Sequence, residues 1–435
     1  MENNHSMPKE EGLDHSLKLL SEGYQFIMNR RHMFHSNIFE TTLLAEKAIC
    51  LTGKEAAEIF YDNEKFKRKG AAPKRLQKTL FGEGGVQAMD GEAHHHRKAM
   101  FMSLMTKESL KEITVLTRKA WENAALKWER EDEIVLYIEA KKILTQVACE
   151  WTGVPLPEDK VEKFSTQLGD MYESAAAIGL KHWKGRRSRS SVESWLEDLV
   201  EEIREEKLEV PTDKALYQFS MHRDLNGELL DKEIVAVELL NLLRPIVAIS
   251  VYVCFSALAV HQYPEEAAKL REGESASLQR FVQEVRRFYP FFPFTAARVK
   301  QDFVWNDYKF EKDTLTLLDL YGTNHHPEDW ENPDRFEPDR FKTWNKSPFD
   351  FIPQGGGEYD IGHRCAGEWL TVDIMNVSLD FLVNDLEYDI PVQDLSFSMS
   401  QIPSLPESKL VMRIKGTRHA DLVTEIQRIF LIKNA

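Results

Sequence analysis

The chain has 435 residues and a formal net charge of -15 at pH 7. That length can bury a large core, and the acidic balance argues against a nucleic-acid partner, which needs a basic face. Residues 1–12 have no apolar h-region, and the longest apolar run, residues 245–260, is shorter than the roughly 20 residues that span a bilayer. The composition therefore predicts a soluble, cytoplasmic protein with no membrane span.

Apolar residues recur at three- and four-residue spacing in eight segments, which predicts helices there. In chain order these are residues 17–30, 54–61, 110–128, 137–152, 192–207, 231–263, 278–289 and 368–385. Strand-like runs lie at residues 48–52, 303–310 and 314–320, and an amphipathic tail helix is predicted at 422–432. No internal repeat or low-complexity linker divides the chain. The expected fold is one mainly α domain over residues 1–435 with a small β part.

Arg244 lies in the most apolar part of the chain, residues 239–263, which contains no carboxylate. Leu240, Val247 and Ala248 fall on the same face of the predicted helix, so a buried arginine is expected rather than a solvated one. An arginine keeps its proton, and burying it without an anion costs on the order of 3–5 kcal/mol. The negative charge must therefore come from outside this segment.

Cys365 stands apart from the other cysteines. The chain has four cysteines and no C-x-x-C pair, so neither a disulfide framework nor a zinc site is expected. Cys50, Cys149 and Cys254 have apolar neighbours and are expected to be buried. Cys365 ends a glycine-rich loop, G-G-G-E-Y-D-I-G-H-R-C, just before a predicted helix. Backbone N–H groups and the helix dipole there stabilise a thiolate, the form that binds metal.

Two motifs precede this loop. Glu284 and Arg287 form E-x-x-R on a predicted helix, a spacing that by itself indicates only an i,i+3 ion pair. F-E-P-D-R-F follows at residues 336–341. These motifs, in this order before a cysteine in a glycine-rich loop, resemble the cytochrome P450 superfamily, and the resemblance covers nearly the whole chain. The segment of residues 351–365 is longer than the superfamily's common F-x-x-G-x-x-x-C pattern.

The resemblance implies the P450 fold and a haem b group whose iron is ligated by the Cys365 thiolate. It also implies that Glu284, Arg287 and Arg340 form a structural network behind the haem rather than acting in catalysis.

His94 and Lys98 match a pair of positions, four apart on a helix, where the family binds the haem propionates. Both are therefore expected to bind the cofactor. A metal site built from His94, His95 and His96 is disfavoured, because consecutive helical residues point about 100° apart.

Most monooxygenases of the superfamily carry an acid followed by Thr in the long distal helix, whereas this chain has Arg244 and Pro245. With Q-E-V-R-R-F-Y-P-F, L-Y-G-T-N-H and I-P-Q-G-G-G, this replacement resembles the bacterial fatty-acid peroxygenases, which use hydrogen peroxide directly. The resemblance implies a long-chain fatty acid and hydrogen peroxide as partners, with no obligatory reductase.

The missing anion then becomes the substrate carboxylate, which pairs with Arg244 and acts as general base and acid on the peroxide. An anchored carboxylate places the α and β carbons nearest the oxidant, so hydroxylation is expected there. Pro245 removes a backbone donor and is expected to kink the helix, which makes room for the acid group.

Gln87 matches a position that faces the substrate in these enzymes. Relatives with His there tend toward decarboxylation to terminal alkenes, and Gln cannot donate a proton as an imidazolium does, so hydroxylation is predicted. Leu80, Phe81, Ala248 and Phe291 match apolar pocket positions and are expected to line an alkyl channel. Ordinary core packing is the alternative for these four residues.

Three other functions remain open. Oxidative decarboxylation of fatty acids would give terminal alkenes as the main product. A reductase-dependent monooxygenase is disfavoured because the acid–Thr pair is absent. A fatty-acid or haem-binding protein without catalysis would show no turnover with peroxide.

Overall fold

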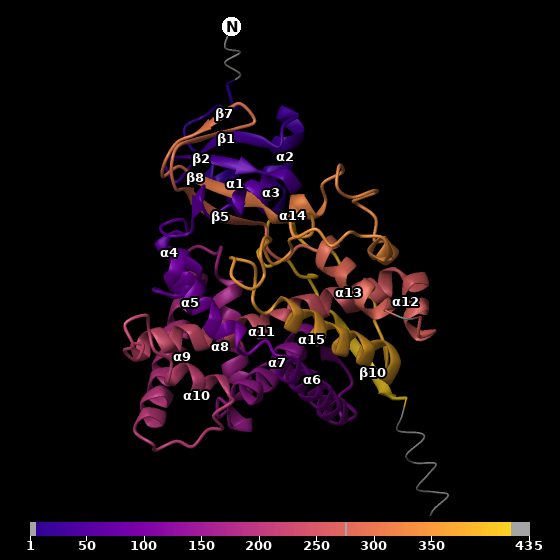
Figure 1. The fold of residues 1–435 in the computed structure, drawn as a ribbon. Coiled ribbons are helices and arrows are strands. Elements are labelled where there is room, and N and C mark those ends of the chain that lie inside the picture. The colour runs from indigo at the N-terminus through magenta and orange to yellow at the C-terminus, as the bar shows by residue number, and fades with distance from the viewer. Residues whose placement is uncertain (1–5, 275, 419–435) are drawn as a thin grey trace, which may run out of the picture.

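The helices predicted from apolar spacing form the larger part of the molecule (Figure 1). The computed structural model describes residues 6–274 and 276–418. Six predicted helices are present with ends within a few residues of those expected, apart from the last turn of the sixth: α3 (Lys54–Phe60), α6 (Lys107–Trp128), α7 (Leu136–Thr152), α11 (Lys232–Gln262), α13 (Ser277–Phe288) and α15 (Glu368–Asp380). The other described helices are α5 (Gly91–Met102), α8 (Val161–Glu173), α10 (Ala215–Ser220), α12 (Pro264–Arg271) and α14 (Leu320–Asn324), with a short α4 (Lys74–Leu76).

The prediction of one helix at residues 17–30 is wrong. The segment forms two helices, α1 (Ser16–Glu22) and α2 (Phe26–Phe34). Gly23, between them, has φ 53°, and a Cβ atom there would lie 2.3 Å from the carbonyl oxygen of Met399. The close approach of a distant segment therefore needs glycine and breaks the helix.

Two other predictions had wrong bounds. The helix expected at residues 192–207 is α9 (Leu180–Arg204), which begins earlier in a basic stretch with little apolar spacing. The strand expected at residues 303–310 is a hairpin of β6 (Phe303–Trp305) and β7 (Tyr308–Phe310), because Asn306 and Asp307 both have positive φ and form the turn. The tail helix predicted at 422–432 lies outside the described residues.

Helix α11 is the centre of the core. It is apolar on all sides, as is typical of a buried helix, and packs against α7, α9, α15 and α8. By length and composition it could cross a membrane, but 89% of its most apolar window is buried inside the protein. The helix continues through Pro245 without a break. It therefore holds Arg244 deep in the molecule.

Three small sheets complete the fold. The five-stranded sheet has the order β1 (Ile38–Leu43), β2 (Glu46–Leu51), β8 (Leu315–Asp319), β5 (Phe294–Val299), β3 (Phe66–Lys67). Only the β2–β8 pair is parallel in this sheet. A second sheet has the order β4 (Ile134–Val135), β10 (Val411–Thr417), β9 (Leu386–Asp389), and the third is the β6–β7 hairpin. The five-stranded sheet lies at one end of the molecule, with α1–α3 beside it and the helical part below it (Figure 1). The mainly α prediction is confirmed.

Candidate functional site

Cys365 lies in the loop that leads into α15. Its backbone N–H donates to the carbonyl of Gln354 at 3.3 Å, and the side-chain amide of Gln354 approaches Sγ at 3.9 Å. Burial raises the pKa of the thiol, while Lys98 and the backbone N–H of Gly367 act in the opposite direction. A metal cation at Sγ would supply the positive charge that favours the thiolate. Cys50, Cys149 and Cys254 are fully buried free thiols, as predicted.

Arg286 holds this loop in place through hydrogen bonds to two side chains. Its guanidinium donates to the side chains of Gln354 at 2.8 Å and Glu368 at 2.7 Å. Glu368 also accepts from Arg364, the residue before the cysteine, at 2.5 Å. The sequence motifs did not indicate this role, because Arg286 stands beside the E-x-x-R pair and has no spacing signature of its own.

A group of cationic and neutral donors faces the same loop. His94 stacks on His363 with ring centroids 3.9 Å apart, and Lys98 Nζ donates to two loop carbonyls at 3.1 and 2.5 Å. Arg68 is buried beside them, and its Nη1 has no hydrogen-bond partner among the described residues. Burial, together with repulsion from Lys98, lowers the pKa of His94 to about 4. Asp90 lies 3.8 Å from His363, but neither Arg68 nor Lys98 forms an ion pair with a carboxylate of the described residues. These two cations therefore fit carboxylates such as the propionates of a haem.

Arg68 was missed by the sequence analysis, because its place in a Lys-Arg-Lys run is typical of a solvated segment. The three consecutive histidines do not converge: His94 is buried, His95 is exposed, and His96 packs on His222 with ring centroids 4.9 Å apart. Within residues 6–274 and 276–418 no group of three or more His, Cys, Asp or Glu side chains could hold a metal ion.

Arg244 is buried, as predicted, with only 5% of its surface exposed. Its Nη2 donates to Asn241 Oδ1 at 3.4 Å, while Nη1 is buried with no hydrogen-bond partner among the described residues. No carboxylate of those residues forms an ion pair with it. Burial, and next repulsion from the buried Arg189, lower the pKa of Arg244 to about 9. The described chain therefore leaves this cation without the anion that its position requires.

Asn241 joins Arg244 to Gln87. Its Nδ2 donates to Gln87 Oε1 at 3.2 Å and to Glu238 Oε2 at 2.9 Å, which turns Oδ1 toward Arg244. Glu238 Oε1 accepts from Arg97 at 2.8 Å and from the backbone N–H of residue 86 at 2.9 Å. Glu238 thus neutralises Arg97 and not Arg244, although it is the nearest acid before the apolar segment. We call Glu238, Asn241, Gln87 and Arg244 the Glu238 chain.

The roles of Asn241 and Glu238 were not predicted from the sequence. The only signal available was their position three and six residues before Arg244, on adjoining turns of one helix. Their hydrogen bonds to Gln87 and Arg97 span 154 and 141 residues, and no local pattern indicates such contacts.

The four expected pocket residues lie in or against the main hydrophobic core. Leu80 and Ala248 are buried in the main hydrophobic core, and Phe81 and Phe291 pack against it. At Gly85, a Cβ atom would lie 3.0 Å from both Gln87 Oε1 and the carbonyl oxygen of Phe81, so these residues converge at the glycine. Ala248 lies one turn after Arg244 on α11, and Phe291 stacks on Tyr252 of the same helix. These positions leave both the channel and the core-packing interpretations in place.

Phe291 stacks on Tyr252 of α11 with ring centroids 4.2 Å apart. The buried Tyr252 hydroxyl has no hydrogen-bond partner among the described residues. Burial raises the pKa of Tyr252, and it lies close enough to Cys365 and Arg286 for their charges to act on it. An orphaned hydroxyl on the wall that faces the cysteine loop is a second observation that fits a polar cofactor or ligand there.

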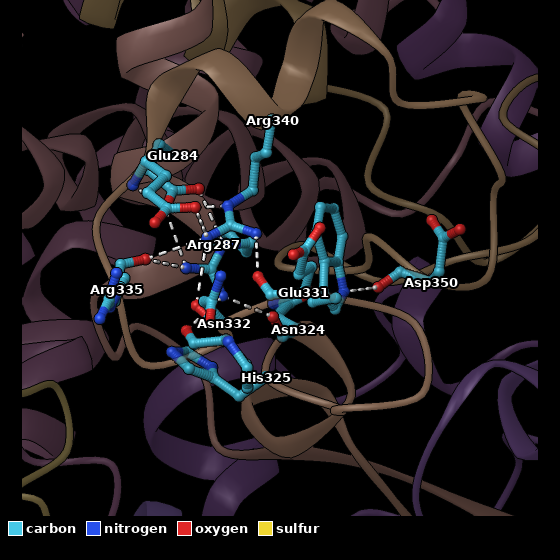
Figure 2. A network of polar contacts seen from close by, with 12 residues as sticks. Glu284, Arg287, Asn324, His325, Glu331, Asn332, Arg335, Arg340 and Asp350 are labelled. Atoms are coloured by element: carbon cyan, nitrogen blue, oxygen red, sulfur yellow. Dashed lines mark hydrogen bonds and ion pairs between the residues drawn. The ribbon is translucent and has the colours of Figure 1, made fainter.

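The E-x-x-R pair forms a closed polar network, as predicted (Figure 2). Both oxygens of Glu284 accept from Arg287 at 2.8 Å, and Oε1 also accepts from Arg340 at 3.2 Å. Arg287 donates further to the carbonyls of Asn324, Pro333 and Arg335 at 2.8–3.0 Å. Every N–H of its guanidinium is used, and Glu284 is fully buried. Arg287 has no donor left for a ligand, which makes this pair structural.

Comparisons with known proteins agree with this geometry. The Cytochrome P450 family model matches residues 158–415. The solved structure of cytochrome P450EX alpha (CYP152N1) with myristic acid is 54% identical, with 94% of this chain and 98% of that chain covered and a TM-score of 0.91. Ligand-free cytochrome P450 OleT is 37% identical, with coverages of 94% and 98% and a TM-score of 0.91. Cytochrome P450 716A75 from Maesa lanceolata is 23% identical over 92% of this chain and 88% of its own length.

The chain belongs to the cytochrome P450 superfamily and, within it, to the CYP152 fatty-acid peroxygenases. It is therefore an oxidoreductase with the single-domain P450 fold. Its cofactor is a haem whose iron is ligated by a cysteine thiolate. The predicted family, fold class and cofactor are confirmed.

Proposed function

We propose that this enzyme uses hydrogen peroxide to hydroxylate long-chain fatty acids at the α and β carbons. The observation that carries the proposal is the buried Arg244, whose Nη1 has no partner and whose guanidinium has no carboxylate among the described residues. When bound, the haem supplies the oxidising chemistry, with electron density from the Cys365 thiolate favouring O–O cleavage. No reductase is required in this proposal, and a soluble, cytoplasmic enzyme is part of it.

Arg244 binds the substrate carboxylate in a charge-assisted hydrogen bond through Nη1. Asn241 holds the guanidinium by accepting from Nη2, so the free edge keeps one orientation. The bound carboxylate takes a proton from one oxygen of the peroxide and returns it to the other, which lets water leave. The substrate thereby supplies the acid–base group that the Arg244–Pro245 sequence lacks.

The position of hydroxylation follows from the anchor. A carboxylate fixed at Arg244 holds the α and β carbons nearest the reacting centre, while Leu80, Phe81, Ala248 and Phe291 surround the alkyl chain. Cytochrome P450EX alpha, whose solved structure holds myristic acid, supports a substrate of this class.

Pro245 and the cofactor partners complete the proposal. Pro245 has no N–H, so the carbonyl four residues before it lacks its helical donor, and the missing hydrogen bond gives the acid group room although the helix continues through this residue. His94 and Lys98, together with Arg68, hold the haem propionates, because Lys98 and Arg68 form no ion pair with a described residue.

Gln87 favours hydroxylation over the alternative, decarboxylation to terminal alkenes. Its Oε1 is engaged by Asn241, which leaves only its neutral amide N–H groups for a ligand. A neutral amide cannot deliver a proton in the way an imidazolium does.

The test is turnover of myristic acid with hydrogen peroxide by the haem-loaded enzyme, with products identified by mass spectrometry. Hydroxy acids are expected as the main products without any reductase, and Gln87→His should raise the alkene fraction. A parent enzyme that gives mainly terminal alkene would contradict the hydroxylase assignment. Strict dependence on an electron donor would contradict the use of peroxide. No turnover at all would indicate a binding protein without catalysis.

A further inference from the structure

The surface around α4 and the start of α9 is strongly basic. Residues 174–192 contain five Lys and Arg and no acid, and residues 69–82 contain four and no acid, in a chain whose net charge is -15. The two segments meet where Arg75 donates to His182 at 3.4 Å. We call this surface the α4–α9 face. Its local charge is opposite to that of the whole molecule.

The same face carries large apolar side chains that are mostly exposed. Ile178, Leu180 and Trp183 are 64%, 89% and 62% exposed. Arg186 lies over the Trp183 ring at 4.9 Å. Exposed Trp and Leu side chains flanked by Lys and Arg are the composition that binds the interface of an anionic lipid bilayer.

Most of the positive charge on the face is not neutralised within the protein. Lys78 pairs with Glu83 at 3.9 Å, Lys184 with Asp170 at 2.8 Å and the buried Arg189 with Glu193 at 2.7 Å. Arg75, Lys181 and Arg187 are exposed, and none of them forms an ion pair with a described residue. These cations are available to an external anionic surface.

The α4–α9 face also adjoins the proposed alkyl channel. Arg189 of α9 is buried and donates to the carbonyl of Leu80 at 2.8 Å, which ties α9 to the segment that carries Leu80 and Phe81. Trp183 precedes Arg189 by six residues, about 9 Å along the helix. The face and the apolar lining are therefore the outer and inner parts of the same two segments.

We propose that the α4–α9 face docks on an anionic lipid membrane, from which a long-chain fatty acid enters the apolar lining beside Leu80. The docking itself depends only on the charge and apolar exposure of the face. The delivery of fatty acid rests in addition on the proposed function. A long-chain acid partitions into bilayers, so an enzyme seated on the membrane meets its substrate at high local concentration.

The docking test is sedimentation of the haem-loaded enzyme with vesicles, without peroxide or added fatty acid. Vesicles with one quarter phosphatidylglycerol should bind the enzyme at least about tenfold more strongly than pure phosphatidylcholine vesicles at low salt. The double variant K181E/R187E, and separately L180S/W183A, should each lower binding to the anionic vesicles by about tenfold or more. The matched control is V304S/K309E, which alters an exposed valine and lysine on the β6–β7 hairpin and should bind like the parent.

Equal binding to both vesicle types, no binding, or unchanged binding of both double variants would overturn the docking proposal. A parent dimer that L180S/W183A converts to a monomer, with no vesicle binding by either, would also overturn it and identify a self-interface.

Delivery is then measured by comparing turnover of octanoic acid in solution with turnover of palmitic acid supplied in anionic vesicles. K181E/R187E should slow only the vesicle-supplied reaction. Absence of turnover with both acids would contradict the proposed function and leave the docking result intact. Equal slowing of both reactions would contradict delivery from the membrane.

Discussion

Two buried arginine sites in this enzyme differ in how completely they are paired. Arg287 uses every N–H of its guanidinium within the network of Glu284 and Arg340. Among the described residues, Arg244 has one hydrogen bond of 3.4 Å and a buried Nη1 without a partner. Burial, with Arg189 adding to the shift, lowers its pKa to about 9. Both residues are inside the protein, so burial alone does not separate a structural arginine from a binding one.

The difference lies in the compensation of the charge. A buried ion whose hydrogen bonds are all made stabilises one conformation and has nothing to offer a ligand. A buried ion without its anion makes the free protein less stable, and any anion that enters recovers that free energy as affinity. On this ground we propose the unsatisfied site, Arg244, as the binding site.

The largest expected effect is a loss of stability when the network of Glu284, Arg287 and Arg340 is broken. Glu284→Gln leaves Arg287 and Arg340 without their shared carboxylate, so the free energy of unfolding should fall by about 3–5 kcal/mol. Urea unfolding and the yield of haem-loaded protein measure this loss. The control is Glu337→Gln, which removes a partly exposed partner of Arg340 and should cost less than about 1 kcal/mol. Equal stability of the two variants would remove the distinction between the sites.

Arg244→Met should lower activity without lowering stability, the reverse of what is expected for Glu284→Gln. Loss of the charge-assisted contact is expected to lower kcat/KM for fatty acids by about 100-fold or more. The ligand-free protein should be as stable as the parent or more stable by about 1–3 kcal/mol, because an unpaired buried charge has been removed. Peroxide turnover and urea unfolding of the same preparation measure both effects. Arg223→Met, at an exposed arginine, should change neither. Full activity of Arg244→Met would contradict carboxylate pairing.

Sequence reasoning found both arginines but not their surroundings. The apolar segment without an acid indicates that Arg244 is buried and unpaired, and the E-x-x-R and F-x-P-x-R-F motifs indicate the Glu284 network. Arg97, which neutralises Glu238 across 141 residues, gives no local signal, because the contact exists only after α5 packs near α11. The burial of Arg68 could not be predicted either, because its basic neighbours are typical of a solvated segment.

The fold was predicted where apolar spacing is strong and missed where other forces decide. Helix α5 carries three histidines and few apolar residues, so periodicity does not reveal it. Helix α8 was missed although Val161, Phe164, Leu168 and Met171 have helical spacing and are buried, so its sequence did contain the signal. The break at Gly23 depends on the distant Met399 and could not be read locally.

Glu238→Gln tests whether the Glu238 chain positions the carboxylate anchor. The change leaves Arg97 unpaired and lets the amide at position 238 donate to Asn241, which can turn Oδ1 away from Arg244. We expect kcat/KM to fall about tenfold with an altered ratio of α to β products, since a small displacement of the anchor changes reactivity. Glu233→Gln, at an exposed acid of the same helix, is the control and should leave the ratio unchanged. An unchanged ratio in Glu238→Gln would make this acid purely structural.

The smallest expected effect is a change in how the free energy of unfolding depends on pH near the Glu284 network. His325 lies beside the Glu284 network (Figure 2), where burial, and next the charge of Arg287, lower its pKa to about 3. The unfolded chain binds this proton near pH 6.5, so stability present above that pH is lost as the pH falls toward 3. One such histidine removes about 1 kcal/mol between pH 6.5 and 5.5. His325→Asn keeps a donor for the carbonyl of Tyr321, which the ring Nδ1 contacts at 2.9 Å, but does not titrate. Urea unfolding should therefore show a shallower loss of stability over that pH range in the variant, whereas parallel curves would place the acid sensitivity elsewhere.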